Sequence, residues 1–127
     1  LQGYVLSSYS GRRLGLPTTA NAGGVHNLIV RPTAGSFEQL LADCPQAFVV
    51  GELLGQGANI VTGDYSRGAA GFWVENGQIV HPVNEVTIAG SLSDIFNRIQ
   101  AVGSDIDYRG TVRCGSVLVD ALTVAGG

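Results

Sequence analysis

The sequence predicts an α+β domain rich in antiparallel strands, barrel-like in curvature, with two short helices. Nineteen glycines separate short β-rich runs, a pattern typical of many strands joined by tight connections. An Asn76-Gly77 pair marks a hairpin turn, and Ser36 and Ser91 stand where helix N-caps are expected. The length of 127 residues suits one domain with a core of its own.

The first half of the chain is expected to contain several strands and one helix. Ser36 and Gln39 form the two ends of a capping box, which predicts a helix over 36–44. The run 47–55 is mostly apolar, which indicates a strand buried on both faces. Further strands are predicted over 3–10, 25–32 and 59–66, with an irregular loop over 11–24.

The hairpin around Asn76-Gly77 is the strongest local signal. This pair suits a type I′ turn, because both central residues of that turn need positive φ. Both faces of the flanking strands are apolar, so we expect the hairpin to lie inside the fold with only its tip in water. The predicted register pairs Glu75 with Gln78, Val74 with Ile79, Trp73 with Val80 and Phe72 with His81.

The second half predicts two more strands and the second helix. A strand is expected over 86–90. Ser91 as N-cap, Asp94 in the box position and an apolar stripe at helical spacing predict a helix over 91–102. The closing run 116–127 has few polar breaks, which indicates a last strand.

The charge content is low for a free-standing domain. Charged residues make up 13% of the chain and hydrophobic residues 45%, whereas about a quarter charged is usual. Methionine is absent, and Leu1 opens directly on an apolar pattern. We therefore expect a piece of a longer polypeptide, or a surface that another chain covers.

Charge and hydropathy also exclude two classes of partner. The seven cations are all arginines with Arg12-Arg13 as the one adjacent pair, and the net charge is −3, so we expect no direct nucleic-acid contact. No apolar run reaches about 18 residues, so we expect no membrane span. Cys44 and Cys114 lie far apart, which favours two half-buried free thiols in a reducing compartment.

The most polar candidate site is the segment that begins at Asp64. A nucleophilic Ser66 would need glycines two residues away on both sides, and Gly63 is one place too far. A turn with a local ion pair between Asp64 and Arg67 is the simpler interpretation. We therefore expect no catalytic residue in this segment.

Metal and phosphate sites find little support in the sequence. His26 and His81 are far apart, and Pro82 excludes a helix around the second. Gly55 and Gly57 resemble a phosphate-binding loop, but Ile60 stands where its third glycine is needed.

The small residues that follow Arg67 would let another backbone lie close. An extended peptide or a partner subunit is the natural candidate. The residues expected to line this substrate or partner edge are Asp64, Tyr65, Ser66, Arg67 and Gly71.

Four segments resemble the C-terminal region of the TldD/PmbA family, and in particular its PmbA branch, also called TldE. They are YSGRRLGLPTTANAGG, GELLGQGANIVTGDYSRGAAGFWVENGQIVHPVNEVTIAGSL, IQAVGSDID and GSVLVDALTVAGG. The stretch VTGDYSRGAAGFWVENG is long and unusual in composition, which makes the resemblance specific. It implies that residues 1–127 are part of the family's C-terminal domain, with upstream residues of the whole protein missing.

The resemblance implies a role in cytoplasmic proteolysis and peptide maturation. In this family, once described as modulators of DNA gyrase, TldD and PmbA subunits form a heterodimer that cleaves peptides and unfolded chains. Zinc is held by the TldD-type subunit, through a helix with the pattern HExxxH and a later cysteine. The place of that cysteine falls near Gly103, and Cys114 does not coincide with it. The resemblance therefore implies a subunit without zinc of its own, with a TldD-type partner and a peptide or unfolded-chain substrate.

Two alternatives stay open. The protein could be a peptidase that is active alone, with its site on the missing segment. It could also be a binding protein that modulates gyrase, because the acidic, lysine-free composition disfavours contact with DNA but not with the enzyme itself.

Overall fold

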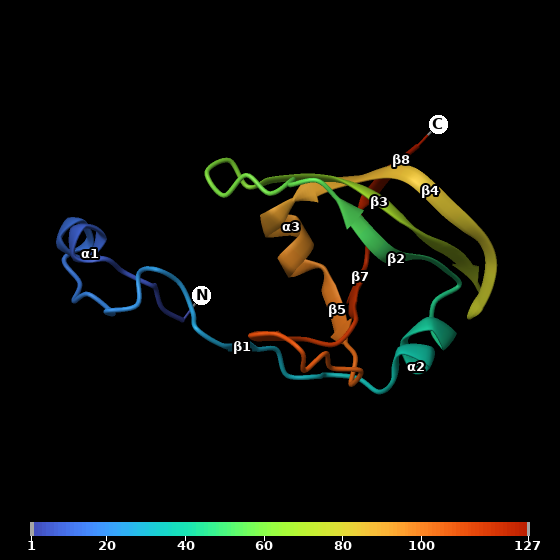
Figure 1. Ribbon diagram of the computed structural model, residues 1–127, viewed down its shortest axis with the longest axis horizontal. Coiled ribbons are helices and arrows are strands. Elements are labelled where there is room, and N and C mark those ends of the chain that lie inside the picture. The colour runs from blue at the N-terminus through green and yellow to red at the C-terminus, as the bar shows by residue number, and fades with distance from the viewer. Residues whose placement is uncertain (1, 127) are drawn as a thin grey trace.

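A computed structural model describes residues 2–126, and Figure 1 shows the arrangement of their helices and strands. Within this range there are three helices, α1 Ser8–Leu14, α2 Phe37–Ala42 and α3 Leu92–Asn97. The eight strands are β1 Leu28–Ile29, β2 Gln46–Leu54, β3 Asp64–Glu75, β4 Gln78–Ser91, β5 Ile99–Val102, β6 Val112–Arg113, β7 Val117–Val119 and β8 Thr123–Ala125. The predicted α+β class is confirmed, although α1 was not predicted.

The main body is a four-stranded antiparallel sheet in the order β2-β3-β4-β8. It curves over α3, β5 and β7, as Figure 1 shows, but stays open rather than closing into a barrel. The second sheet pairs β5 with β7 in antiparallel fashion, and the third pairs β1 with β6 in parallel over two residues each. Within residues 2–126, the outer edges of β2 and β7 are therefore left without a neighbouring strand.

The predicted β3–β4 turn is confirmed, with φ values of 48° at Asn76 and 76° at Gly77. The pairs of Glu75 with Gln78 and of Val74 with Ile79 are confirmed as well. Beyond them the predicted register is wrong by one residue. A bulge leaves Val80 unpaired, so that Trp73 lies opposite His81 and Phe72 opposite Pro82.

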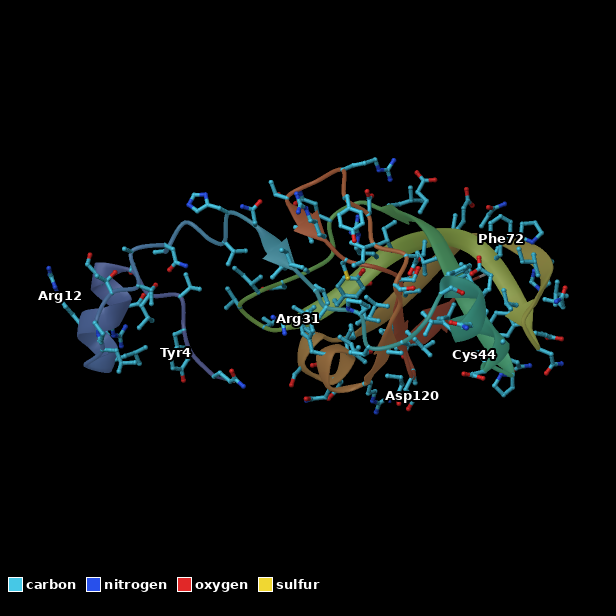
Figure 2. All side chains as sticks on the ribbon, turned by 90° about the horizontal axis from the view of Figure 1, so that it is seen from below. Tyr4, Arg12, Arg31, Cys44, Phe72 and Asp120 are labelled. Carbon is cyan, nitrogen blue, oxygen red and sulfur yellow. The ribbon has the colours of Figure 1, made fainter. Side chains whose placement is uncertain are left out.

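The predicted burial of this hairpin is confirmed for Val74 and wrong for two neighbours on the same face. Val74 is fully buried, but Phe72 is 43% exposed and Ile79 is 64% exposed. Figure 2 shows Phe72 at the surface, apart from Cys44 and Asp120. Val74 lies between two neighbouring strands, whereas β8 pairs only with Thr87 to Ala89, so Ile79 lies at an open edge of the sheet.

Two elements predicted in the second half differ in the structure, because their residues pair with strands that are distant in sequence. The helix predicted over 91–102 ends at Asn97, because residues 99–102 form β5 and pair with β7. The side chain of Ser91 makes no capping hydrogen bond. The strand predicted over 116–127 divides into β7 and β8, and its last residue, Gly127, lies outside the described residues.

The N-terminal segment projects from the main body as an arm, with Tyr4 and Arg12 at its far end (Figures 1 and 2). A strand over 3–10 was predicted, but helix α1 begins at Ser8. The Ser7 hydroxyl caps it by accepting from the backbone N–H of Ser10 at 3.1 Å. The backbone of Leu6 is held by the Thr18 and Thr19 hydroxyls, each at 2.8 Å, which folds the arm back on itself.

Other boundaries also differ from the prediction. The capping box of Ser36 and Gln39 is confirmed, and α2 follows it. The predicted loop over 11–24 is helical as far as Leu14, and the strand predicted over 25–32 is reduced to β1. The strand predicted over 59–66 begins at Asp64, because residues 60–62 form a turn. The strand predicted over 86–90 is the end of the longer β4.

The buried apolar set is small for 127 residues, and it comprises Leu6, Leu40, Ala69, Val74, Ile88 and Val102. The prediction that β2 is buried on both faces is wrong, because β2 is an edge strand with its second half exposed. Many large apolar side chains of the described residues remain in contact with water. Exposure on this scale is typical of surfaces that another polypeptide covers.

The close approach of β2 and β3 depends on Gly71. The register between these strands shifts at Val50 to Glu52, where a bulge brings the two backbones together. A methyl group at Gly71 would overlap the carbonyl oxygen of Val49 and the backbone nitrogen of Gly51. Gly71 therefore does admit a close backbone, as predicted from sequence, but that backbone is β2 of the same chain.

Gly71→Ala is expected to lower the free energy of unfolding by about 2 kcal/mol or more, because β2 must move away from β3. Gly51→Ala is the matched control, since a methyl group there meets its nearest atoms at 3.7 Å and 3.8 Å, which is ordinary contact. Urea unfolding of both variants checks the prediction. Equal midpoints for the two variants would contradict it.

Candidate functional site

An open apolar groove of about 690 Å³ runs between the four-stranded sheet, α2 and the segment around β7. Helix α2 contributes Phe37, Leu40 and Leu41 to its wall. Strand β2 and its neighbours contribute residues 45–50, and the C-terminal segment contributes residues 116–122 with Val124. The groove is therefore built from elements that are far apart in the sequence.

The groove meets the edges of two strands as well as their faces. Side chains of a strand alternate between its two sides, so a groove along one face would touch every second residue. Here every residue from Gln46 to Val50 lines the groove, and so does every residue from Ser116 to Leu122. Because β2 and β7 each have one described neighbour strand, their remaining backbone groups border a space that could accept an extended chain.

Trp73 contributes an aromatic surface to the groove. Its strand partner Phe48 lines the groove beside it, which gives the two rings a common surface. The indole Nε1 donates to Oε1 of Glu75 at 3.0 Å, which satisfies the polar end of the ring and fixes its orientation. The prediction that Trp73 is buried is confirmed only in part, since its side chain is half-buried.

The entry to β7 is fixed by Asp105. Its carboxylate accepts from the backbone N–H of Ser116 at 3.0 Å and from the Ser116 hydroxyl at 2.6 Å. These bonds favour the ionised form, and the Ser116 hydroxyl is the main reason that the pKa of Asp105 lies below its ordinary value. The carboxylate of Asp105, which does not itself line the groove, therefore positions one of its walls.

The residues predicted to form an edge lie at the start of β3, and none of them lines the groove. Their backbone is paired on both sides. Ser66 lies opposite Ala89 of β4, and its N–H donates to the carbonyl oxygen of Gly57 at 2.8 Å. The idea that a peptide adds here as a strand is therefore wrong, because no free edge remains. That the side chains of Asp64, Tyr65, Ser66, Arg67 and Gly71 face a substrate or partner stays a prediction.

The ion pair expected between Asp64 and Arg67 is absent from the described structure. The Asp64 carboxylate instead accepts from the Thr62 hydroxyl at 2.6 Å. The Arg67 guanidinium donates to the carbonyl oxygens of Gly55 and Leu53. Both side chains thus serve to shape the loop between β2 and β3, a role that residue types alone did not indicate.

In residues 2–126 the one ion pair joins Asp107 and Arg109, at 2.8 Å, in the exposed loop before β6. Hydrogen bonds from the Arg109 side chain lower the pKa of Asp107 to about 2. This pair lies outside the groove lining.

The structure does not bring together the residues that could form a metal site. His26 lies in the arm and His81 in β4, where its Nδ1 is 3.0 Å from the carbonyl oxygen of Pro82. Among the described residues there is no group of three or more His, Cys, Asp or Glu placed to hold a metal ion. Cys44 and Cys114 are free and half-buried, as predicted.

Across residues 2–126, none of the helices has both the length and the apolar character that crossing a bilayer requires.

The fold and the groove describe an α+β domain with an open apolar surface. The family model of the PmbA/TldA metallopeptidase C-terminal domain matches residues 1–126, so the chain belongs to this family.

Two similar proteins both carry the name PmbA. The chain is 53% identical to "Metalloprotease PmbA" of Escherichia coli O157:H7, over 97% of the chain and 27% of that protein. It is 49% identical to "Metalloprotease PmbA homolog" of Haemophilus influenzae, over 99% of the chain and 28% of that protein. The chain thus spans little more than a quarter of the length of the curated relatives it matches.

Solved structures support the same fold. A protein of Thermotoga maritima described as a modulator of DNA gyrase superposes with a TM-score of 0.85 at 37% identity, over 98% of this chain and 31% of that one. TldE of Thermococcus kodakarensis superposes with a TM-score of 0.79 at 18% identity, over 99% of this chain and 32% of that one. The second comparison shows the fold alone.

Sequence reasoning missed the groove. The run 47–55, which contributes to its lining, was predicted as a buried strand, because an apolar strand beside an open groove has the same composition as a buried one. The signal that could have indicated it is the low charge content of the chain, which already implied a covered surface.

Ser66→Ala is expected to leave peptide cleavage within a few-fold of the wild type, because no base lies near Ser66 among its described hydrogen-bond partners. The measurement is cleavage of an unstructured peptide by the full-length protein, alone and together with a TldD-type subunit. A loss of about a thousandfold with intact assembly would identify Ser66 as a nucleophile and contradict this assignment.

Proposed function

We propose that this domain belongs to a PmbA/TldE-like subunit of a cytoplasmic TldD/TldE metallopeptidase complex that processes peptides and unfolded chains. The observation that carries the proposal is the apolar groove bordered by the edges of β2 and β7. It offers the two things an extended peptide needs, which are unpaired backbone groups for hydrogen bonds and an apolar surface for side chains. The domain thus binds and positions, and does not itself break bonds.

In this proposal the zinc ion is held by the TldD-type subunit. The supporting observation is the distribution of possible ligands in the described residues, where His26, His81, Cys44 and Cys114 do not gather into one site. A zinc site needs at least three protein ligands at one point, so this domain contributes binding surface instead.

If the TldD-type subunit holds the zinc ion, zinc content and peptide cleavage should both depend on that subunit. The full-length protein alone is expected to hold no stoichiometric zinc and to cleave no peptide, while its complex with a TldD-type subunit holds zinc and is active. Elemental analysis and peptide cleavage on both preparations check this. Zinc and activity in the full-length protein alone would favour the alternative of an independent peptidase. Failure of the two proteins to associate, together with binding to gyrase, would favour the gyrase-modulating alternative.

Peptide binding in the groove is tested with a substitution that fills the groove with a large side chain. Ala121→Trp places a large ring in the groove at an exposed position and is expected to raise KM for an unstructured peptide about tenfold or more, because the peptide and the ring compete for space. Ala22→Trp is the matched control, since Ala22 is also exposed but lies in the arm outside the groove. Equal kinetic constants for the two variants would show that the groove does not bind substrate.

A further inference from the structure

The loop between β2 and β3 carries two apolar side chains at its tip that the described residues leave uncovered. Ile60 is 90% exposed and Val61 is 89% exposed. Figure 1 shows this loop projecting beyond the end of the four-stranded sheet, on the side where α3 lies. We call residues 55–63 the finger. Single exposed apolar residues are common, but two adjacent ones at the end of a projecting loop have the form of an interaction site.

The tip of the finger is fixed by its own hydrogen bonds. The backbone N–H of Asn59 donates to the carbonyl oxygen of Asp64, and the N–H of Gly63 donates to the carbonyl oxygen of Asn59, both at 2.8 Å. The Oδ1 of Asn59 accepts from the N–H of Val61 at 2.9 Å and of Thr62 at 3.2 Å. One asparagine side chain therefore holds the backbone that carries the exposed pair.

The base of the finger is anchored to the sheet and to α3. The Arg67 guanidinium donates to the carbonyl oxygens of Gly55 and Leu53. The N–H of Leu92, the first residue of α3, donates to the carbonyl oxygen of Gly63 at 2.7 Å. A loop that is fixed in this way loses little conformational freedom when it binds, so most of the gain from burying its tip becomes affinity.

We infer that the finger is a docking element that inserts Ile60 and Val61 into an apolar pocket of a partner protein subunit. Clusters of this size at the centre of an interface can dominate its binding free energy. The predicted edge residues Asp64 and Arg67 then have a role, because they shape the finger from its base. The identity of the subunit, a TldD-type chain, rests on the proposed function.

The charges around the tip favour a protein over a lipid surface. Loops that insert into bilayers combine apolar tips with basic residues that attract anionic headgroups. Here the neighbouring Asp64 is acidic, the guanidinium of Arg67 is held by carbonyl oxygens, and the chain has no lysine and a net charge of −3. A bilayer is therefore the weaker candidate.

The test compares two Ile-Val pairs in the full-length protein. In the first variant Ile60→Ser and Val61→Ser are combined. In the matched control Ile79→Ser and Val80→Ser are combined, at the start of β4, where these side chains are 64% and 53% exposed and lie outside the groove. The Kd for a purified TldD-type subunit is measured by isothermal calorimetry. The finger variant is expected to bind about thirtyfold more weakly than the wild type, and the control within twofold.

Each other result overturns the inference in a distinguishable way. If the wild-type protein binds the subunit and the finger variant binds equally well, the finger does not dock there, although the proposed function stands. If the wild-type protein does not bind the subunit at all, the proposed function fails together with the inference. If the finger variant alone melts several degrees lower, the tip packs within its own chain. If the wild-type protein binds vesicles of phosphatidylglycerol and the finger variant does not, the tip recognises lipid.

Discussion

The whole domain depends on the close approach of β2 and β3 at Gly71. Because no side chain stands between the strands there, the carbonyl oxygen of Val49 can lie against the Gly71 backbone, and β3 can pair on both sides along its length. The four-stranded sheet then has its open edge at β2 rather than at β3. A larger residue at this position would separate the strands and remove the surface on which the groove is built.

An open edge beside an apolar groove would be a liability in a free-standing domain, because exposed strand edges pair with other chains. The same feature is useful in a part of a larger assembly. The small buried core and the low charge content agree with this view, because both leave much apolar surface of the described residues uncovered. In the proposed function, the domain's exposed apolar surfaces are the places where other polypeptides bind.

The groove and the finger are two different kinds of exposed apolar surface. The groove has unpaired backbone and a broad apolar lining, which suits an extended and variable chain. The finger has a small, fixed apolar tip, which suits one preformed pocket. Among the described residues, neither surface contains a group of three or more His, Cys, Asp or Glu placed to hold a metal ion.

The sequence by itself determined the features that depend on neighbouring residues. The positive φ values at Asn76 and Gly77 and the capping box of Ser36 with Gln39 are local, so they could be predicted from a few letters. Tertiary pairing alone decided that Ile99 to Val102 form a strand instead of continuing a helix, and that Asp64 to Arg67 are enclosed on both sides. It also decided that the apolar segments around Phe48 and Leu118 line a groove. These features could not be predicted because whether an apolar residue is buried, paired or exposed depends on chain segments tens of residues away, which local patterns do not specify.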